Sequence, residues 1–234
     1  MTDIHSHVLP AIDDGARNIE ASLSMLRQAY TQGVRTLVAT PHAVIHSEED
    51  IDEFLHDRQL AYQTLTEAVS QESVPAPQLL LGAELYLDHD VSRHTGLKRL
   101  CLGASSCVLM EFPTEKDFPK HGEEWFYEMN YRGIVPVIAH IDRYPFWKDV
   151  LEALSSLRIY YQINASAFLT FSGRRLIHKL MKYGYPYIVS SDMHSVHARP
   201  CNMKAAYAIA EKSYKEQAIE LFDTNAQEML GVVV

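Results

Sequence analysis

The chain alternates short β-rich segments with segments of helical periodicity along its length. Ile19, Leu23, Leu26 and Tyr30, for example, recur at helical spacing before Gly33. Seven segments are predicted as strands: residues 3–7, 35–40, 79–85, 107–112, 134–139, 159–164 and 187–191. Strands that alternate with helices pair in parallel, so the pattern predicts an α/β fold, either a barrel or an open sheet. A chain of 234 residues fits one such domain, spanning residues 1–234.

Six of the seven predicted strands end in, or run directly into, a His, Asp or Glu. The first carries His5 and His7, and residues two apart point to the same side of a strand. Such a pair also arises by chance on protein surfaces. Glu84 and Glu111 stand in apolar runs, where a charge is seldom buried unless it is metal-bound or, as the alternative here, ion-paired. The sixth strand offers only Asn164. The other strand ends supply His42, His140, Asp192 and His194.

Functional residues of parallel barrels collect at the C-terminal ends of the strands, so these side chains are expected to converge. With Asp14, from the turn after the first strand, the set holds five imidazoles, four carboxylates and no thiolate. Its members are His5, His7, Asp14, His42, Glu84, Glu111, His140, Asp192 and His194. Mixed nitrogen and oxygen ligation suits Mn, Fe, Zn or Co. Nine ligands are enough for two or three ions, and closely spaced ions both activate water and clamp phosphoryl oxygens in phosphate ester hydrolysis.

Two arginines follow the predicted ligands closely. Arg143 comes soon after His140, and Arg199 soon after His194. A guanidinium fork binds a phosphate with two parallel hydrogen bonds, so both are candidate substrate clamps. A surface salt bridge is the alternative role for either one.

Composition narrows the range of partners and compartments. The net charge is −9, with acidic residues spread along the chain, which argues against nucleic acid as the main partner. Cys101, Cys107 and Cys201 fit neither a zinc spacing nor a disulfide framework, and none begins a C-x5-R phosphate loop. They are interpreted as reduced thiols in or near the core. No signal peptide or membrane span is visible, so we expect a cytoplasmic location.

Six motifs in fixed order give the chain a resemblance to a known family. They are DIHSHVLPAIDDG (3–15), TPH (40–42), GAELY (82–86), MEF (110–112), VIAHIDRY (137–144) and SSDMH (190–194). The chain resembles the polymerase and histidinol phosphatase (PHP) superfamily, and within it the bacterial tyrosine phosphatases associated with capsule and exopolysaccharide synthesis. The resemblance covers essentially the whole chain. It implies a distorted seven-stranded, TIM-like (βα) barrel with three metal ions, commonly manganese, with iron, cobalt, zinc or magnesium as alternatives.

The resemblance also implies how the ligands divide among the three ions. His5, His7, Glu84 and Asp192 would hold the first ion. Glu84, as a bridge, would hold the second with Glu111 and His140, and the third would lie between Asp14, His42 and His194. Arg143 and Arg199 match the family's phosphate-contacting arginines. Asp142 stands where close relatives usually have Glu, which would alter the clamp if that side chain orients Arg143.

Three functions are compatible with these features. The leading hypothesis is a metal-dependent protein-tyrosine phosphatase that uses a metal-activated hydroxide without a phosphocysteine. The resemblance implies that its partner is an autophosphorylating tyrosine kinase controlling polysaccharide export. The second hypothesis is a PHP enzyme for a small phosphomonoester such as histidinol phosphate. The third is a binding module that has lost catalysis, against which the complete ligand set argues.

Overall fold

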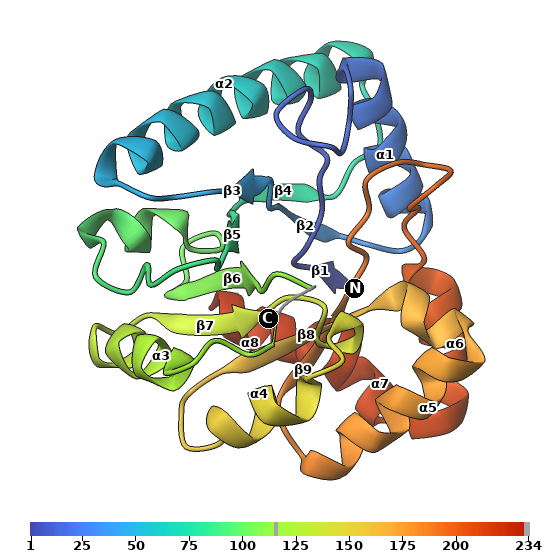
Figure 1. Ribbon diagram of the computed structural model, residues 1–234. Helices are drawn as coiled ribbons and strands as arrows, with labels where there is room; N and C mark the ends of the chain where they lie inside the picture. The colour runs from blue at the N-terminus through green and yellow to red at the C-terminus, as the bar shows by residue number, and fades with distance from the viewer. Residues whose placement is uncertain (115–116, 232–234) are drawn as a thin grey trace.

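The computed structural model describes residues 1–114 and 117–231, which form parallel strands flanked by helices (Figure 1). The strands are β1 (Thr2–Asp3), β2 (Thr36–Ala39), β3 (His42–Ala43), β4 (Gln78–Leu81), β5 (Glu84–Tyr86), β6 (Cys107–Glu111), β7 (Val135–Ile138), β8 (Tyr160–Asn164) and β9 (Tyr187–Ser190). The α-helices are α1 (Ile19–Thr31), α2 (Glu48–Glu72), α3 (Gly122–Tyr131), α4 (Trp147–Ala153), α5 (Phe171–Leu180), α6 (Met203–Tyr214), α7 (Gln217–Ile219) and α8 (Asn225–Leu230). Short 3-10 helices cover Thr95–Leu100, Ile141–Arg143, Ala165–Leu169 and Met181–Tyr183, and a π-helix covers Glu220–Thr224.

All strand pairs in the structure are parallel, which confirms the predicted α/β class. The strands form two sheets, ordered β1-β2-β4 and β3-β5-β6-β7-β8-β9. The predicted seven-stranded barrel is not confirmed. In the described part of the chain there are nine strands, and their ladders do not join into one closed barrel.

The strand predicted over residues 79–85 is divided in the structure into β4 and β5. The strand predicted over 35–40 is β2, and β3 follows it as a short additional strand. Pro41 lies between β2 and β3, and proline has no N–H to donate to a ladder. Across the break, Gly82 N–H donates to Ala39 O (2.8 Å) and Glu84 N–H donates to Pro41 O (3.0 Å). The chains therefore stay adjacent, and His42 pairs with Glu84 at the start of the new ladder.

The first predicted strand is shorter than expected. The regular ladder of β1 stops at Asp3, and beyond it Ser6 forms an isolated parallel bridge with Met193. His7 N–H donates to Met193 O (3.0 Å), and Asp192 N–H donates to His5 O (3.0 Å). The segment after β1 and the segment after β9 are thus fixed against each other by main-chain bonds.

Helices cover the outside of the strands. Figure 1 shows the long α2 lying across one side of the molecule, next to α1, while α5 and α6 lie on another side. Helix α2 begins directly after Ser47, which forms a capping box with Asp50 at the first turn. Strand side chains such as Leu109 and Ile188 are fully buried. No helix in residues 1–114 or 117–231 is long and apolar enough to cross a membrane.

Candidate metal centre

Glu84 is the hub of the buried polar cluster. Its side chain is 1 % exposed. Its Oε2 lies 3.1 Å from His5 Nε2, 3.2 Å from His7 Nε2 and 3.1 Å from His42 Nδ1, while its Oε1 lies 3.0 Å from His140 Nε2. One carboxylate therefore contacts four imidazoles that come from three separate parts of the chain.

His5 and His7 point to one place, as their spacing predicted. Both side chains are fully buried, and their Nε2 atoms lie 3.2 Å apart. Asp192 comes from the segment after β9, and its Oδ1 lies 3.4 Å from His5 Nε2 and 3.7 Å from His7 Nε2. The main-chain bonds between these two segments explain why residues so distant in sequence meet.

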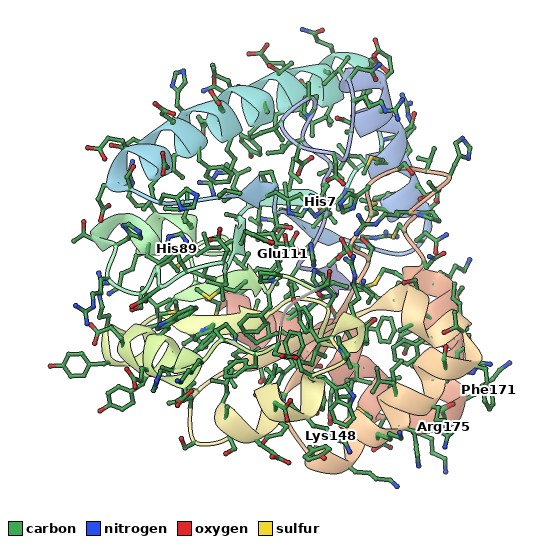
Figure 2. The ribbon with its side chains drawn as sticks, in the orientation of Figure 1. His7, His89, Glu111, Lys148, Phe171 and Arg175 are labelled. Carbon is green, nitrogen blue, oxygen red and sulfur yellow. The ribbon has the colours of Figure 1, made fainter. Side chains whose placement is uncertain are left out.

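Glu111 and His140 complete one side of the cluster, at the ends of β6 and β7. His140 Nε2 lies 3.3 Å from Glu111 Oε2, and the other oxygen of Glu111 lies 3.2 Å from His42 Nδ1. Figure 2 places Glu111 and His7 toward the centre of the molecule, among the ends of the strands.

Asp14 and His194 form the opposite, more open side with His42. Asp14 Oδ1 lies 3.3 Å from His42 Nε2 and 3.2 Å from His194 Nε2. The turn that carries Asp14 approaches the cluster closely because of Gly15, where a Cβ would lie only 2.2 Å from His7 O. All nine predicted ligands therefore lie in one connected cluster.

Charges within the cluster shift the acidities of its members. Burial lowers the pKa of His5, but the negative charges of Glu84 and Asp192 outweigh it and raise that pKa to about 10. Burial raises the pKa of Glu84, yet the neighbouring imidazoles, His5 above all, hold it well below its usual range. Burial and the adjacent His7 lower the pKa of His194 to about 4. Without cations, the carboxylates are thus balanced by protons held on buried imidazoles.

The donor set fits metal ions. His7 Nδ1 lies 2.7 Å from Asp13 Oδ2, and His5 Nδ1 lies 3.1 Å from Gln162 Oε1, so each Nδ1–H has an acceptor. In the neutral form both Nε2 atoms then present lone pairs to each other and to Glu84, which is unfavourable unless a proton or cation lies between them. Three overlapping groups of His and carboxylate residues here could each hold an ion: His7, Asp14, His42 and His194; His5, His7 and Glu84; and His42, Glu84 and Glu111.

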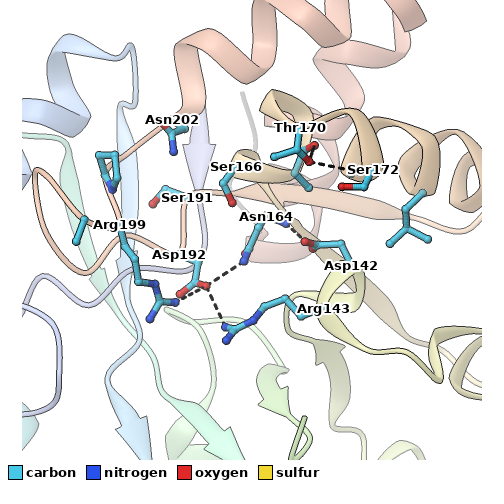
Figure 3. A pocket seen from close by; sticks show the side chains of 15 residues that line it. Asp142, Arg143, Asn164, Ser166, Thr170, Ser172, Ser191, Asp192, Arg199 and Asn202 are labelled. Atoms are coloured by element: carbon cyan, nitrogen blue, oxygen red, sulfur yellow. Dashed lines mark hydrogen bonds and ion pairs between the residues drawn. The ribbon is translucent and has the colours of Figure 1, made fainter. Parts of the chain in front are cut away.

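Both predicted arginines reach the edge of the cluster through Asp192 (Figure 3). Arg199 Nη2 donates to Asp192 Oδ2 at 2.6 Å, and Arg143 Nη1 lies 3.6 Å from the same oxygen. Both guanidinium side chains are about two-fifths exposed and line a cavity of about 510 Å³. Asp142 accepts from the Asn164 N–H (2.8 Å), so its carboxylate bonds to the main chain of β8.

Two polar side chains that contact the cluster were missed from sequence. Asp13 accepts from His7 Nδ1–H and from the His42 N–H (3.3 Å), so it orients two of the predicted ligands. Gln162 is fully buried in β8 and contacts His5. The signal for Gln162 was a single polar residue inside the apolar run of 159–164, the same signal that identified Glu84.

Fold and cluster together define an α/β protein whose parallel strands gather five imidazoles and four carboxylates at their carboxyl ends. The chain belongs to the family described as capsular polysaccharide synthesis, CpsB/CapC, whose model matches residues 1–231. It is 32% identical over 251 residues to the tyrosine-protein phosphatase CpsB of Streptococcus agalactiae, covering 98% of both chains. It is 29% identical to the tyrosine-protein phosphatase YwqE of Bacillus subtilis, covering 98% of this chain and 91% of that one.

A solved structure supports the same relationship. It is described as belonging to YwqE from Bacillus subtilis and CpsB from Streptococcus pneumoniae, unique metal-dependent tyrosine phosphatases. This chain matches it with a TM-score of 0.85 and 27% identity over 100% of this chain and 96% of that one. The two chains therefore share the same fold over nearly their whole lengths.

Proposed function

We propose that this chain is a metal-dependent protein-tyrosine phosphatase. The observation that carries the proposal is the buried cluster around Glu84, in which one carboxylate contacts four imidazoles at 3.0–3.2 Å. The similar proteins support the substrate class, since they are tyrosine-protein phosphatases. The buried thiols support a route without a cysteine nucleophile, because burial raises the pKa of Cys101 and of Cys107 to about 11.

The nine clustered residues are proposed as ligands for three cations, with manganese as the proposed metal. Asp14, His42 and His194 would hold one, which their mutual contacts support. The other proposed sets are His5, His7, Glu84 and Asp192, and Glu84, Glu111 and His140. Bound cations would lower the pKa of a coordinated water and neutralise phosphoryl oxygens.

Arg143 and Arg199 are proposed to bind and orient the phosphate group. Each lies at the cavity edge with a partly exposed guanidinium, and each faces Asp192 Oδ2. A bound phosphate would replace solvent on the free edge of each fork, which aligns phosphorus with the cluster. The cavity beside them is lined by hydroxyl and amide side chains, among them Ser166, Thr170 and Asn202, which are suited to the polar backbone of a peptide substrate.

The biological setting is also a proposal. The family description points to capsular polysaccharide synthesis, which supports an autophosphorylating tyrosine kinase of that process as the substrate. Free cysteines at positions 101, 107 and 201 support a reducing, cytoplasmic location. Residues 1–234 are proposed to form a single PHP domain, although the last three lie outside the described residues.

We further propose that the two sheets belong to one distorted seven-stranded barrel. Strand β3 follows β2 after an interruption at Pro41, and beside them β5 follows β4 in the same way. This supports counting β2 with β3 as one strand and β4 with β5 as another. The bridge between Ser6 and Met193 supports the approach of the first strand to the last.

The test is hydrolysis by chelator-stripped protein with manganese added back. We expect release of phosphate from phosphotyrosine peptides but not from phosphoserine peptides or histidinol phosphate. His194→Ala should abolish turnover and lower metal content, while His178→Ala, an exposed histidine on α5, should change neither. Faster release of phosphate from histidinol phosphate would show that the proposed substrate class is wrong. Full activity of His194→Ala with unchanged metal content would refute the proposed metal site.

A further inference from the structure

Strand β8 contributes no charged residue to the cluster, yet two of its amides are buried against it. Gln162 is fully buried and Asn164 is 6 % exposed. Gln162 Oε1 accepts from the backbone N–H of His140 (2.5 Å) and lies 3.1 Å from His5 Nδ1. Gln162 Nε2 donates to Asn164 Oδ1 (2.9 Å), and Asn164 Nδ2 donates to Asp192 Oδ2 (3.0 Å). The two amides therefore connect three of the predicted ligands.

We call the chain of hydrogen bonds from His140 through Gln162 and Asn164 to Asp192 the amide relay. The direction of its hydrogen bonds is fixed at both ends. A backbone N–H can only donate, so the atom of Gln162 that faces His140 is the amide oxygen. The amide nitrogen then faces Asn164, which must present its own oxygen and turn its nitrogen toward Asp192. An ionised carboxylate can only accept, so the far end agrees with the near end. No alternative flip of either amide satisfies all four contacts.

A relay of fixed direction has consequences for the ligand atoms. Because Gln162 Oε1 can only accept, His5 must keep a proton on Nδ1, so Nε2 is the nitrogen whose lone pair becomes available to a cation beside Glu84 and His7. Asn164 and Arg199 both donate to Oδ2 of Asp192, so the other oxygen of that carboxylate stays directed at the imidazoles.

The relay also contacts the two predicted ligands with left-handed backbone conformations. His140 has φ 30° and Asp192 has φ 51°, which non-glycine residues adopt only where the surroundings hold them. Gln162 bonds to the backbone of His140, and Asn164 bonds to the side chain of Asp192. These bonds are suited to keeping both strand-end residues in the orientation that points them into the cluster.

We propose that Gln162 and Asn164 act as one unit of positioning residues for the metal centre, which holds the His5 ring with its proton on Nδ1 and holds the Asp192 rotamer. The proposal rests on the metal-binding part of the proposed function and deepens it. In this role both amides act through the residues that they hold.

The experiment measures Mn²⁺ affinity by competition with a chelating indicator, together with metal content and thermal unfolding of the stripped proteins. Gln162→Leu and Asn164→Ala should each weaken Mn²⁺ binding by about 10–100-fold, the range typical for loss of a group that orients a ligand. If the two residues form one unit, the double variant should bind about as weakly as the weaker single variant. Asn164→Ala removes the smaller side chain and keeps the test decisive if Gln162→Leu does not fold.

The matched control is Asn130→Leu. Asn130 is also a structural amide, since its Nδ2 donates to Ile134 O and Arg158 O and its Oδ1 accepts from the Arg158 N–H, but it lies outside the cluster. This variant should lower stability and leave Mn²⁺ affinity unchanged.

Two results would overturn the inference: single variants within about twofold of wild-type affinity, or losses that multiply in the double variant. The readout separates this inference from the proposed activity. Weakened Mn²⁺ binding in the variants of a protein without phosphatase activity would retain the relay and overturn the phosphatase. An active phosphatase whose variants bind Mn²⁺ normally would retain the proposed activity and overturn the relay.

Discussion

Replacing Glu84 by Gln removes one negative charge from the centre of the cluster while keeping the shape of the side chain. In the metal-free protein Glu84 contacts four imidazole nitrogens at 3.0–3.2 Å and is 1 % exposed. Removing one partner of a buried, hydrogen-bonded charge arrangement costs roughly 3–5 kcal/mol. In a protein of this size each kcal/mol corresponds to roughly 2–4 °C, so the midpoint of thermal unfolding should fall by roughly 6–20 °C.

The same substitution should remove metal binding more severely than the loss of an orienting amide. Since loss of an orienting group lowers affinity by about 10–100-fold, loss of a carboxylate that itself faces the cation position should exceed about 100-fold. The assays are chemical denaturation of the stripped protein and metal content after dialysis. Glu53→Gln, on the exposed face of α2, is the matched control and should change stability by less than about 0.5 kcal/mol.

A Glu84→Gln protein that keeps wild-type metal content and loses less than about 1 kcal/mol of stability would refute the reasoning. Such a result would mean that packing alone, without the charge of Glu84, holds the imidazoles in their positions. It would also remove Glu84 as the bridge between two of the proposed cation sites.

Three further outcomes follow from the geometry. Metal loading at about pH 7.5 should release about two protons, because the negative neighbours raise the pKa of His5 to about 10 and that of His42 to about 9, whereas ligation needs neutral imidazoles. Calorimetry in two buffers of different ionisation enthalpy counts the released protons, and the release should disappear above about pH 10. Arg199→Lys should raise KM for phosphotyrosine peptides by about tenfold at unchanged metal content, because an ammonium cannot make the two parallel hydrogen bonds that a guanidinium makes to a phosphate. A change in metal content with unchanged KM would contradict the role of Arg199 in phosphate binding. Burial raises the pKa of Cys201 to about 12, and the other two cysteines are buried as well. Iodoacetamide at about pH 8 should therefore label the cysteines only after unfolding and leave the activity of the native protein intact. Rapid labelling of the native protein with loss of activity would contradict the assignment of these residues as buried thiols.

The α/β class and the convergence of the nine site residues were predictable because both depend on local patterns. Alternating strand and helix periodicity indicates parallel strands, and parallel strands place their carboxyl ends on one edge. His5, Glu84 and Asp192 meet for this reason although they come from distant parts of the chain.

The division of the strands was not predictable from periodicity. The apolar pattern of 79–85 continues through Gly82, and the second strand was predicted to end before Pro41, but ladder hydrogen bonds depend on which neighbour each N–H faces. A proline matters only once its position opposite another strand is known. The early end of β1 has a similar cause, since the pairing of Ser6 with Met193 joins segments that sequence analysis treats separately.

Gln162 shows a limit of searching a sequence by charge. It and Glu84 have the same signature, a polar residue within an apolar strand, and both are buried in the cluster. Charge marked Glu84 as a ligand candidate, whereas a neutral amide in β8 drew no attention. Yet a buried amide needs partners as much as a buried charge does, because its unpaired N–H or C=O costs about 1–3 kcal/mol. In a strand whose neighbours all end in ligands, the partners available to such an amide are the ligands themselves. A buried Gln or Asn in the one strand without a charged end therefore predicts the groups that orient the site.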